Sequence, residues 1–288
     1  MVFDSLFKPK GKIELQSKDG CLSGALLPVE IRITPEEEII PRAVRAELIG
    51  EETYYVTETH RDAKGNVRTH VVPRTDTFAS IIQTVAEQPS LLQGMEQKWS
   101  CSMQLPADAP HTCRGKLVNI RWTLKGILDV PKRGDLSQEK PIHVFCQSRQ
   151  ISDGSLLPAE KIFDEVTLIL KTPQVASAGT TLKGQLTLQV KDKLSIRSIR
   201  VELVQVEEAG TRKGDEVIST TQLPGAASFN PNESPTFEFS LDIPASAPPT
   251  ITCKHSSLRW KVRAVLDRKM KSDFNVEREL LMYNDRPL

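Results

Sequence analysis

The sequence predicts an all-β fold made of two tandem antiparallel β-sandwiches. Three observations lead to this prediction: a long segment that occurs twice, apolar residues that alternate with polar ones, and turn-forming residues spread along the chain. At 288 residues, the chain is long enough for two domains of ordinary size, each with its own core.

The repeat is the strongest of these signals. Residues 240–267 resemble residues 102–129 without a gap, at a constant offset of 138 that takes Ser102 to Ser240. The shared residues include two prolines and an Arg-Trp pair in each copy, at Pro106/Pro244, Pro110/Pro248, Arg121/Arg259 and Trp122/Trp260. Each tryptophan is expected to bury ~150–250 Å² and so to anchor one sandwich.

A second match lies upstream and shows that the repeat covers whole domains. The segment RAVRAELIGEE from Arg42 parallels RSIRVELVQVEE from Arg197, at an offset of 155 instead of 138. Two matches in the same order indicate a duplicated domain, with 17 additional residues between the matches in the first copy. A period this long excludes a solenoid, whose repeats have ~20–50 residues.

The strands are predicted from a period of two in the apolar residues, because successive side chains of a strand point to opposite faces. This alternation is clearest in residues 120–128 and 258–266. Residues 54–60 and 67–72 flank Lys64-Gly65-Asn66 and predict a long hairpin. Residues 78–87 are the best helical candidate, but their β-branched residues and Pro89 leave a strand or a loop equally open.

The boundary between the copies is placed where alternation stops. Residues 150–160 contain Gly154 and Pro158 and show no strand pattern. The predicted division is therefore a first sandwich at 1–149, a linker at 150–160 and a second sandwich at 161–288. Relative movement of the two sandwiches across this linker is part of the expected mechanism.

Composition excludes several classes of protein. The 38 basic and 37 acidic residues balance, so we expect no nucleic-acid partner, and peripheral membrane association has no support in the sequence. No apolar stretch approaches ~20 residues, and the N-terminal residues lack the features of a secretory signal. The five cysteines are odd in number and form no CxxC pair, which fits a cytoplasmic protein with reduced thiols.

The repeated segment reads as a strand, a proline-bounded connection and a long returning strand. In the first copy a Leu-Leu-Gln-Gly run at 91–94 precedes Leu105-Pro106, Ala109-Pro110 and Arg121-Trp122. In the second copy the same order is Ile243-Pro244, Ala247-Pro248 and Arg259-Trp260. This combination resembles the arrestin-like superfamily over nearly the whole chain, although each motif is short.

The resemblance implies tandem immunoglobulin-like, arrestin-like sandwiches, an arrestin N-like one at 1–149 and an arrestin C-like one at 161–288. It also implies a non-enzymatic scaffold or adaptor in trafficking or signalling that binds a protein partner. The sequence has no PPxY motif, so the ubiquitin-ligase recruitment typical of α-arrestins is not expected. The sporulation-control and retromer-subunit branches share the architecture, and the motifs do not separate them. A sporulation-control-like regulatory protein is therefore an alternative.

Two groups of residues are candidate binding sites. The long hairpin is the main candidate for partner binding, because hairpins on rigid sandwiches commonly carry recognition, and an inert loop is the alternative. Its residues are Tyr54, Tyr55, His60, Arg61, Arg68 and His70. Basic residues on strand faces are candidates for an acidic or phosphorylated peptide, with edge protection and cross-strand ion pairs as the structural alternatives. They are Lys8, Lys10, Lys12, Arg121, Lys125, Arg259, Lys261 and Arg263, with Glu47 and Glu202 as expected partners of Arg121 and Arg259.

No catalytic, cofactor or metal site is expected. The sequence has no GxSxG elbow, HExxH motif, phosphate-binding glycine loop or dinucleotide fingerprint. His60 and His70 could approach each other across the hairpin, but no carboxylate or cysteine stands at a ligand spacing beside them. A β-sandwich hydrolase or carbohydrate-active protein remains as the alternative of a different class, although it would need clustered carboxylates that the sequence does not display.

Overall fold

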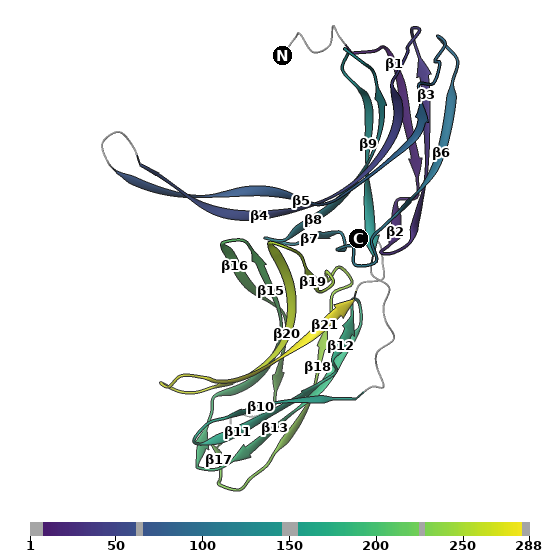
Figure 1. Cartoon of the computed structure of the whole chain (residues 1–288). Coiled ribbons are helices and arrows are strands. Elements are labelled where there is room, and N and C mark those ends of the chain that lie inside the picture. Colours follow the sequence, from purple (N-terminus) through teal and green to yellow (C-terminus); the bar gives the residue numbers. More distant parts are fainter. Residues whose placement is uncertain (1–7, 62–65, 146–154, 225–227, 284–288) are drawn as a thin grey trace.

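The computed structural model describes residues 8–61, 66–145, 155–224 and 228–283, and every regular element in these ranges is a β-strand. The chain forms two β-sandwiches in tandem, mostly antiparallel, as the sequence predicts (Figure 1). Alternating burial runs along the inner strands, for example in β3, where every second side chain is buried.

The first sandwich has a three-stranded sheet and a larger sheet facing it. The three-stranded sheet consists of β1 (Gly11–Ser17), β3 (Leu26–Pro35) and β6 (Gln97–Gln104), in that order. The larger sheet has the order β2 (Gly20–Leu22), β9 (Leu136–Phe145), β8 (Asn119–Asp129), β4 (Ala43–Arg61) and β5 (Val67–Glu87), with β7 (Cys113–Arg114) beside β8. The segment 78–87 is thus strand, and it pairs with β4 over the first sandwich.

The second sandwich repeats this plan with one additional edge strand. One sheet has the order β10 (Leu157–Ile162), β11 (Val166–Thr172), β13 (Thr181–Val190) and β18 (Thr236–Asp242). The other has the order β12 (Val175–Ser177), β21 (Phe274–Tyr283), β20 (Ser256–Asp267), β15 (Ser198–Ala209) and β16 (Arg212–Leu223), with β19 (Ile251–Thr252) beside β20. The short strands β14 (Leu194–Ser195) and β17 (Ser228–Phe229) pair with each other.

The two sandwiches correspond strand by strand at the offsets found in the sequence. An offset of 155 takes β1, β2 and β3 onto β11, β12 and β13, and an offset of 138 takes β7 and β9 onto β19 and β21. Even the parallel pair β2–β9 has its counterpart in β12–β21. The strand β10 has no counterpart in the described part of the first sandwich. Residues 157–160 of the predicted linker belong to it, and the remaining linker residues up to 154 lie outside the described ranges.

The two tryptophans occupy matching places in two separate interiors. Trp122 and Trp260 are each 1% exposed and belong to different hydrophobic clusters. Each indole donates to a proline carbonyl oxygen in the repeated connection, Trp122 to Pro110 at 2.8 Å and Trp260 to Pro248 at 3.0 Å. This shared bond explains why the prolines and the tryptophan recur together, because it fixes the connection against the core strand.

Candidate functional site

The sandwiches meet through two buried glutamates that each bind a loop of the opposite sandwich. Glu207, near the end of β15, is 4% exposed. Its Oε1 atom accepts the backbone N–H of Lys116 at 3.0 Å, and its Oε2 atom accepts those of Leu117 at 2.6 Å and Val118 at 2.8 Å. A side chain on Gly115 would place its Cβ atom 2.5 Å from the Glu207 carboxylate, so the carboxylate would have to shift from its present place.

Glu52, on β4, makes the reciprocal contact and is fully buried. Its carboxylate accepts the backbone N–H of His255 at 3.0 Å and the hydroxyl of Ser256 at 2.7 Å. The offset of 155 takes Glu52 to Glu207, and the offset of 138 takes residues 117 and 118 to His255 and Ser256. We call these contacts the Glu52 clamp and the Glu207 clamp. They are equivalent, so an approximate two-fold relation joins the two copies.

The base of the long hairpin also rests on the second sandwich. Gly210, in the turn between β15 and β16, bridges to Tyr55, and the Tyr55 carbonyl accepts the N–H of Thr211 at 2.8 Å. Gly210 has φ +60°, and an added Cβ atom would lie 2.0 Å from the Tyr55 oxygen, so only glycine fits. The Arg212 guanidinium lies 4.8 Å from the centre of the Tyr55 ring.

Beside the Glu52 clamp lies a cluster of polar side chains that the Glu207 clamp lacks. Asp76, on β5, accepts a bond from Lys254 at 2.8 Å and lies 3.2 Å from Nε2 of His255. The bond from Lys254 holds the pKa of the Asp76 carboxyl below its usual value. Tyr54 stacks on the His255 ring, with 4.2 Å between ring centres. We call Glu52, Asp76 and His255, together with Tyr54 and Lys254, the junction cluster.

Two cysteines lie near the clamps, and their thiols are protonated at neutral pH. Burial, with the nearby charge of Glu207, raises the pKa of Cys113 to about 12. Burial likewise raises the pKa of Cys253 to about 12, with a smaller contribution from Glu52. Because the thiolate is the reactive form, neither cysteine is suited to nucleophilic chemistry.

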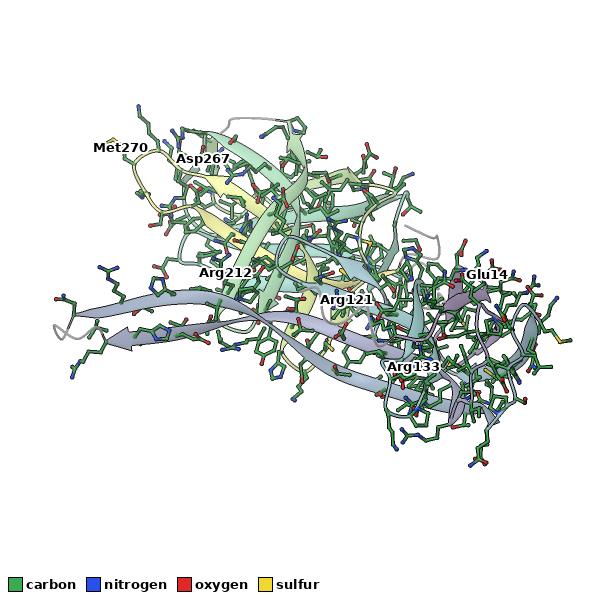
Figure 2. All side chains as sticks on the ribbon, turned by 90° about the horizontal axis from the view of Figure 1, so that it is seen from above. Glu14, Arg121, Arg133, Arg212, Asp267 and Met270 are labelled. Atoms are coloured by element: carbon green, nitrogen blue, oxygen red, sulfur yellow. The ribbon has the colours of Figure 1, made fainter. Side chains whose placement is uncertain are left out.

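The predicted hairpin residues separate into two groups. Tyr54 and Tyr55 lie in the contact with the second sandwich described above. The side chains of His60, Arg61, Arg68 and His70 are exposed, and they lie further out along β4 and β5. Figure 2 shows these two strands leaving the sandwich as a long ribbon. The two imidazole rings approach each other across the strands as expected, with 6.4 Å between their centres. The predicted turn at 64–66 falls mostly on residues outside the described ranges.

The basic residues at the start of the chain surround the edge of β1. Lys8, Lys10 and Lys12 all carry exposed side chains. The Lys12 ammonium pairs with Glu14, and the backbone N–H of Lys10 donates to Glu37 at 3.0 Å. The ammonium groups of Lys8 and Lys10 are therefore accessible to an anion, whereas that of Lys12 already has a carboxylate partner.

The basic stripes on the returning strands are built into ion pairs. Arg121 pairs with Glu51 at 2.8 Å and Arg259 with Glu208 at 2.6 Å. The expected partners Glu47 and Glu202 were therefore wrong. The register places Glu47 opposite Lys125 and Glu202 opposite Arg263, so each lies four residues along the strand from its expected arginine, or ~13 Å.

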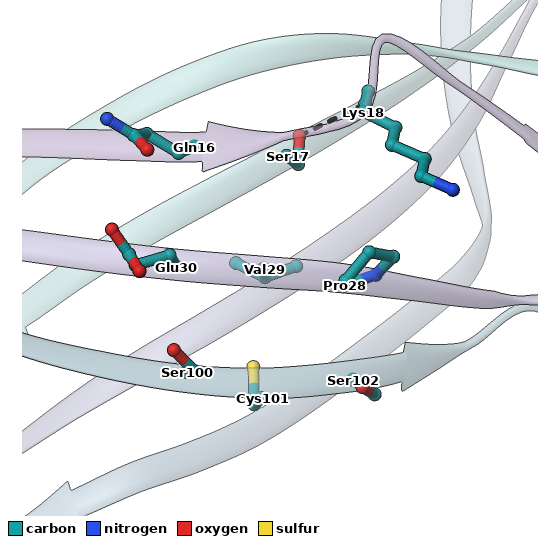
Figure 3. A pocket seen from close by; sticks show the side chains of 9 residues that line it. All are labelled: Gln16, Ser17, Lys18, Pro28, Val29, Glu30, Ser100, Cys101 and Ser102. Atoms are coloured by element: carbon teal, nitrogen blue, oxygen red, sulfur yellow. Dashed lines mark hydrogen bonds between the residues drawn. The ribbon is translucent and has the colours of Figure 1, made fainter.

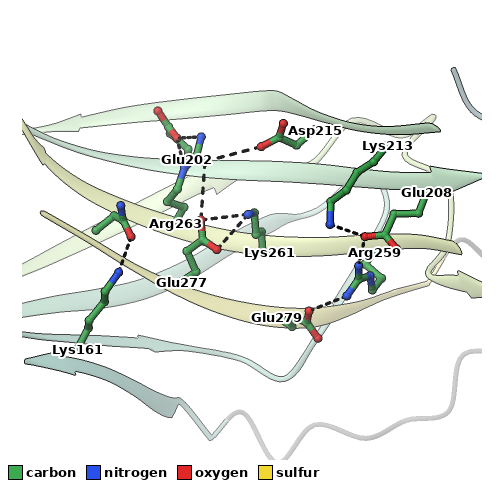
Figure 4. A network of polar contacts seen from close by, with 11 residues as sticks. Lys161, Glu202, Glu208, Lys213, Asp215, Arg259, Lys261, Arg263, Glu277 and Glu279 are labelled. Carbon is green, nitrogen blue, oxygen red and sulfur yellow. Dashed lines mark hydrogen bonds and ion pairs between the residues drawn. The ribbon is translucent and has the colours of Figure 1, made fainter. Parts of the chain in front are cut away.

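The second sandwich carries most of this pairing. Glu202 is bound by Arg200 at 2.7 Å and by Arg263 at 2.7 Å, and Lys261 binds Glu277 at 3.0 Å (Figure 4). In the first sandwich, Lys125 pairs with Glu139 at 3.1 Å. All five basic residues of the stripes thus have carboxylate partners. The geometry favours their structural role over anion binding.

Two of the depressions on the described surface bear on the candidate sites. A shallow groove of about 650 Å³ crosses β1, β3 and β6, and its lining mixes serines such as Ser100 and Ser102 with charged and apolar side chains (Figure 3). A pocket of about 480 Å³ lies between the loop of Lys116 and the β15–β16 hairpin, beside Glu207. Neither brings together an acid, a base and a nucleophile in a catalytic arrangement.

Sequence models of one family match both halves of the chain. The model described as "Arrestin (or S-antigen), C-terminal domain" matches residues 13–148. The model described as "Arrestin (or S-antigen), N-terminal domain" matches residues 231–285. The chain belongs to the arrestin-like superfamily. A search of curated proteins found no match to this chain.

The two matches follow the reverse of the order that their descriptions suggest. Two copies of one sandwich can each resemble either arrestin domain, because both domains share the architecture. The labels N-like for 1–149 and C-like for 161–288 therefore stay a prediction. Arrestin domains are typical of adaptors in trafficking and signalling that bind protein partners and do not catalyse reactions. None of the described residues belongs to a helix that could span a membrane.

Proposed function

We propose that this arrestin-like chain is a cytoplasmic, non-enzymatic scaffold or adaptor, and that it binds its protein partner through the outer part of the long hairpin. We call that part, residues 56–61 and 67–74, the arm. The observation that carries the proposal is that the arm is regular strand although almost every side chain from 57 to 61 and from 67 to 71 is exposed.

The fold itself does not require the arm. In the second sandwich the equivalent hairpin, β15 and β16, has 12 residues in each strand, whereas β4 and β5 have 19 and 21. A two-stranded ribbon without a covered face is only marginally stable in water. Such a ribbon gains stability when a partner covers a face or adds a strand to one of its edges.

The charges of the arm favour an acidic or phosphorylated partner segment. Glu58 is already bound by Arg74 and lies 3.6 Å from His60. Arg61 and Arg68 have exposed side chains near the tip. Arginine binds carboxylate and phosphate groups through paired hydrogen bonds, so these two residues suit an acidic strand laid along the ribbon.

The edge of β1 is a second place where a strand could add. In the second sandwich, β10 pairs with the equivalent strand β11 from Leu157 to Ile162. In the described part of the first sandwich no strand lies on that edge of β1. Residues 2–7, which the sequence offset of 155 aligns with β10, lie outside the described ranges. Exposed Lys8 and Lys10 lie beside this edge.

A shortened arm separates binding from folding. Replacing residues 58–70 by Asn-Gly joins Thr57 to Val71, which face each other in register, through a two-residue turn. We expect the free energy of unfolding to change by less than about 1 kcal/mol, because the removed residues bury little surface. A partner captured by the wild type from native lysate and identified by mass spectrometry should lose its binding to the shortened protein.

Two further measurements make this test specific. Charge reversal of Arg61 and Arg68 together should weaken binding of the captured partner. Lys183→Glu on the second sandwich should leave this binding unchanged. In hydrogen exchange of the complex, the amides of the arm should become protected. Protection confined to β1, with full binding by the shortened protein, would move the partner site to the β1 edge and overturn the role of the arm.

A further inference from the structure

The two clamps are equivalent in architecture but differ in the side chains around them. At the Glu52 clamp, the neighbours are Asp76 and His255. At the same positions of the Glu207 clamp, the register of β15–β16 and the offset of 138 place Gly214 and Leu117. The Glu207 clamp closes without an acid or an imidazole at these positions. Asp76 and His255 are therefore not required for holding the sandwiches together.

The stacking ring is a third difference of the same kind. Tyr54 lies on the His255 imidazole, and the equivalent of Tyr54 by the offset of 155 is Ala209. The tyrosine ring fixes the orientation of the imidazole, whose Nε2 atom lies 3.2 Å from the Asp76 carboxylate. One of the two sites thus carries an acid, an oriented imidazole and the ring that orients it, all in addition to the shared glutamate.

The ligand atoms of the three residues are close enough for one ion. A carboxylate oxygen of Glu52, a carboxylate oxygen of Asp76 and a ring nitrogen of His255 all lie within 4.8 Å of one another. Glu52 is fully buried, and its hydrogen bonds from His255 and Ser256 come from neutral donors. Buried carboxylates are usually paired with a cation or bound to a metal.

The charges at the site favour a cation. Glu52 and Asp76 bring two negative charges, and the Lys254 ammonium at 2.8 Å from Asp76 brings one positive charge. The Lys254 side chain is 66% exposed, so its ammonium can turn into solvent and leave Asp76 to another cation. One imidazole and two carboxylates form a ligand set for zinc and related divalent transition metals.

We propose that Glu52, Asp76 and His255 bind a divalent transition-metal ion of the zinc class at the contact between the two sandwiches. The ion binds residues from β4, β5 and the loop before β20, so it ties the two sandwiches together. Lys254 occupies the position of the cation when metal is scarce. The proposal does not depend on the identity of a protein partner.

Zinc titration of the untagged full-length protein tests this proposal. Isothermal calorimetry with Zn²⁺ alone should show one ion per chain in the wild type. His255→Leu should lower the affinity at least ten-fold, and so should Asp76→Asn. His255→Leu is expected to fold, because Leu117 occupies the equivalent position at the other clamp. Far-UV circular dichroism and the urea midpoint without metal confirm folding.

Matched variants distinguish a metal site from an ion-pair network. Lys254→Met removes the competing ammonium and should raise the affinity for zinc several-fold. Lys116→Met, the equivalent change at the other clamp, should leave the affinity unchanged. His70→Gln should also leave it unchanged, because the arm histidines are not ligands. The proposal is overturned if neither the wild type nor Lys254→Met binds zinc, or if His255→Leu binds as tightly as the wild type.

Discussion

Replacing Glu207 by alanine is expected to lower the free energy of unfolding by about 3 kcal/mol. The carboxylate satisfies three consecutive backbone N–H groups, of Lys116, Leu117 and Val118, in a place where the glutamate is 4% exposed. Without the carboxylate, the three N–H groups have no acceptor in the contact. They are then satisfied only if water enters between the two sandwiches. Urea unfolding of the full chain, followed by tryptophan fluorescence, measures the change.

Two further variants show whether the loss comes from the clamp. Gly115→Ala should reproduce part of it, because the new Cβ atom would lie 2.5 Å from the carboxylate. Glu216→Ala removes an acid whose side chain is 42% exposed and which pairs only at the surface with Lys116, so it should change stability by less than about 0.5 kcal/mol. Equal effects of Glu216→Ala and Glu207→Ala would contradict the clamp.

Glu202→Gln is expected to lower stability by about 2 kcal/mol at neutral pH. The carboxylate is 6% exposed and bound by both Arg200 and Arg263. Burial pushes the pKa of the Glu202 carboxyl up, but the bonds from the two arginines outweigh burial and hold the pKa below its usual value. A variant without the charge leaves both guanidinium groups without this partner.

The lowered pKa of Glu202 determines how the effect of Glu202→Gln on stability changes with pH. Such a group contributes its stability fully above the pKa of the unfolded chain, ~4.3, and loses it as the pH falls through the lower folded value. The difference between wild type and Glu202→Gln should therefore be largest at neutral pH and shrink below about pH 4. Urea unfolding across this range measures it, with Glu139→Gln, exposed and paired with Lys125, as a control that should show little difference at any pH. A pH-independent difference would show that packing and not charge is lost.

Much of the fold is predictable from the sequence because its determinants are local or repeated. The period of two locates the inner strands, and the offset repeat aligns the two sandwiches even down to the indole bonds of Trp122 and Trp260. The segment 78–87 was ambiguous because its pattern allows a helix while its β-branched residues allow a strand, and pairing with β4 decides for the strand.

The sites were less predictable because their partners are distant in sequence. Glu52 and His255 are separated by 203 residues, and only the docking of the sandwiches brings them together. The repeat did contain a signal, since Glu52 and Glu207 stand at the offset of 155, but a glutamate at a strand end does not by itself indicate an interdomain bond. The Arg121 and Arg259 partners were missed because a strand's register decides which acid lies opposite.

The clamps also bear on the mechanism of an adaptor. Movement across the connection between the sandwiches was expected from the linker alone. Two buried glutamates, the stacked Tyr54 and the Tyr55–Gly210 bridge oppose such movement, because each must break before the sandwiches can separate. Under the proposed function, the arm would be presented from a fixed platform, and partner binding would not bear the cost of ordering two domains.

The distance between the sandwiches in solution tests this account most directly. Spin labels introduced with unnatural amino acids at Ile40 and Met270, which are 77% and 95% exposed, report it by pulsed electron paramagnetic resonance. One narrow distance distribution is predicted for the wild type, and a broad one for the double variant Glu52→Ala/Glu207→Ala. A broad distribution in the wild type, or an unchanged narrow one in the double variant, would contradict the claim that the reciprocal glutamates hold the two copies together.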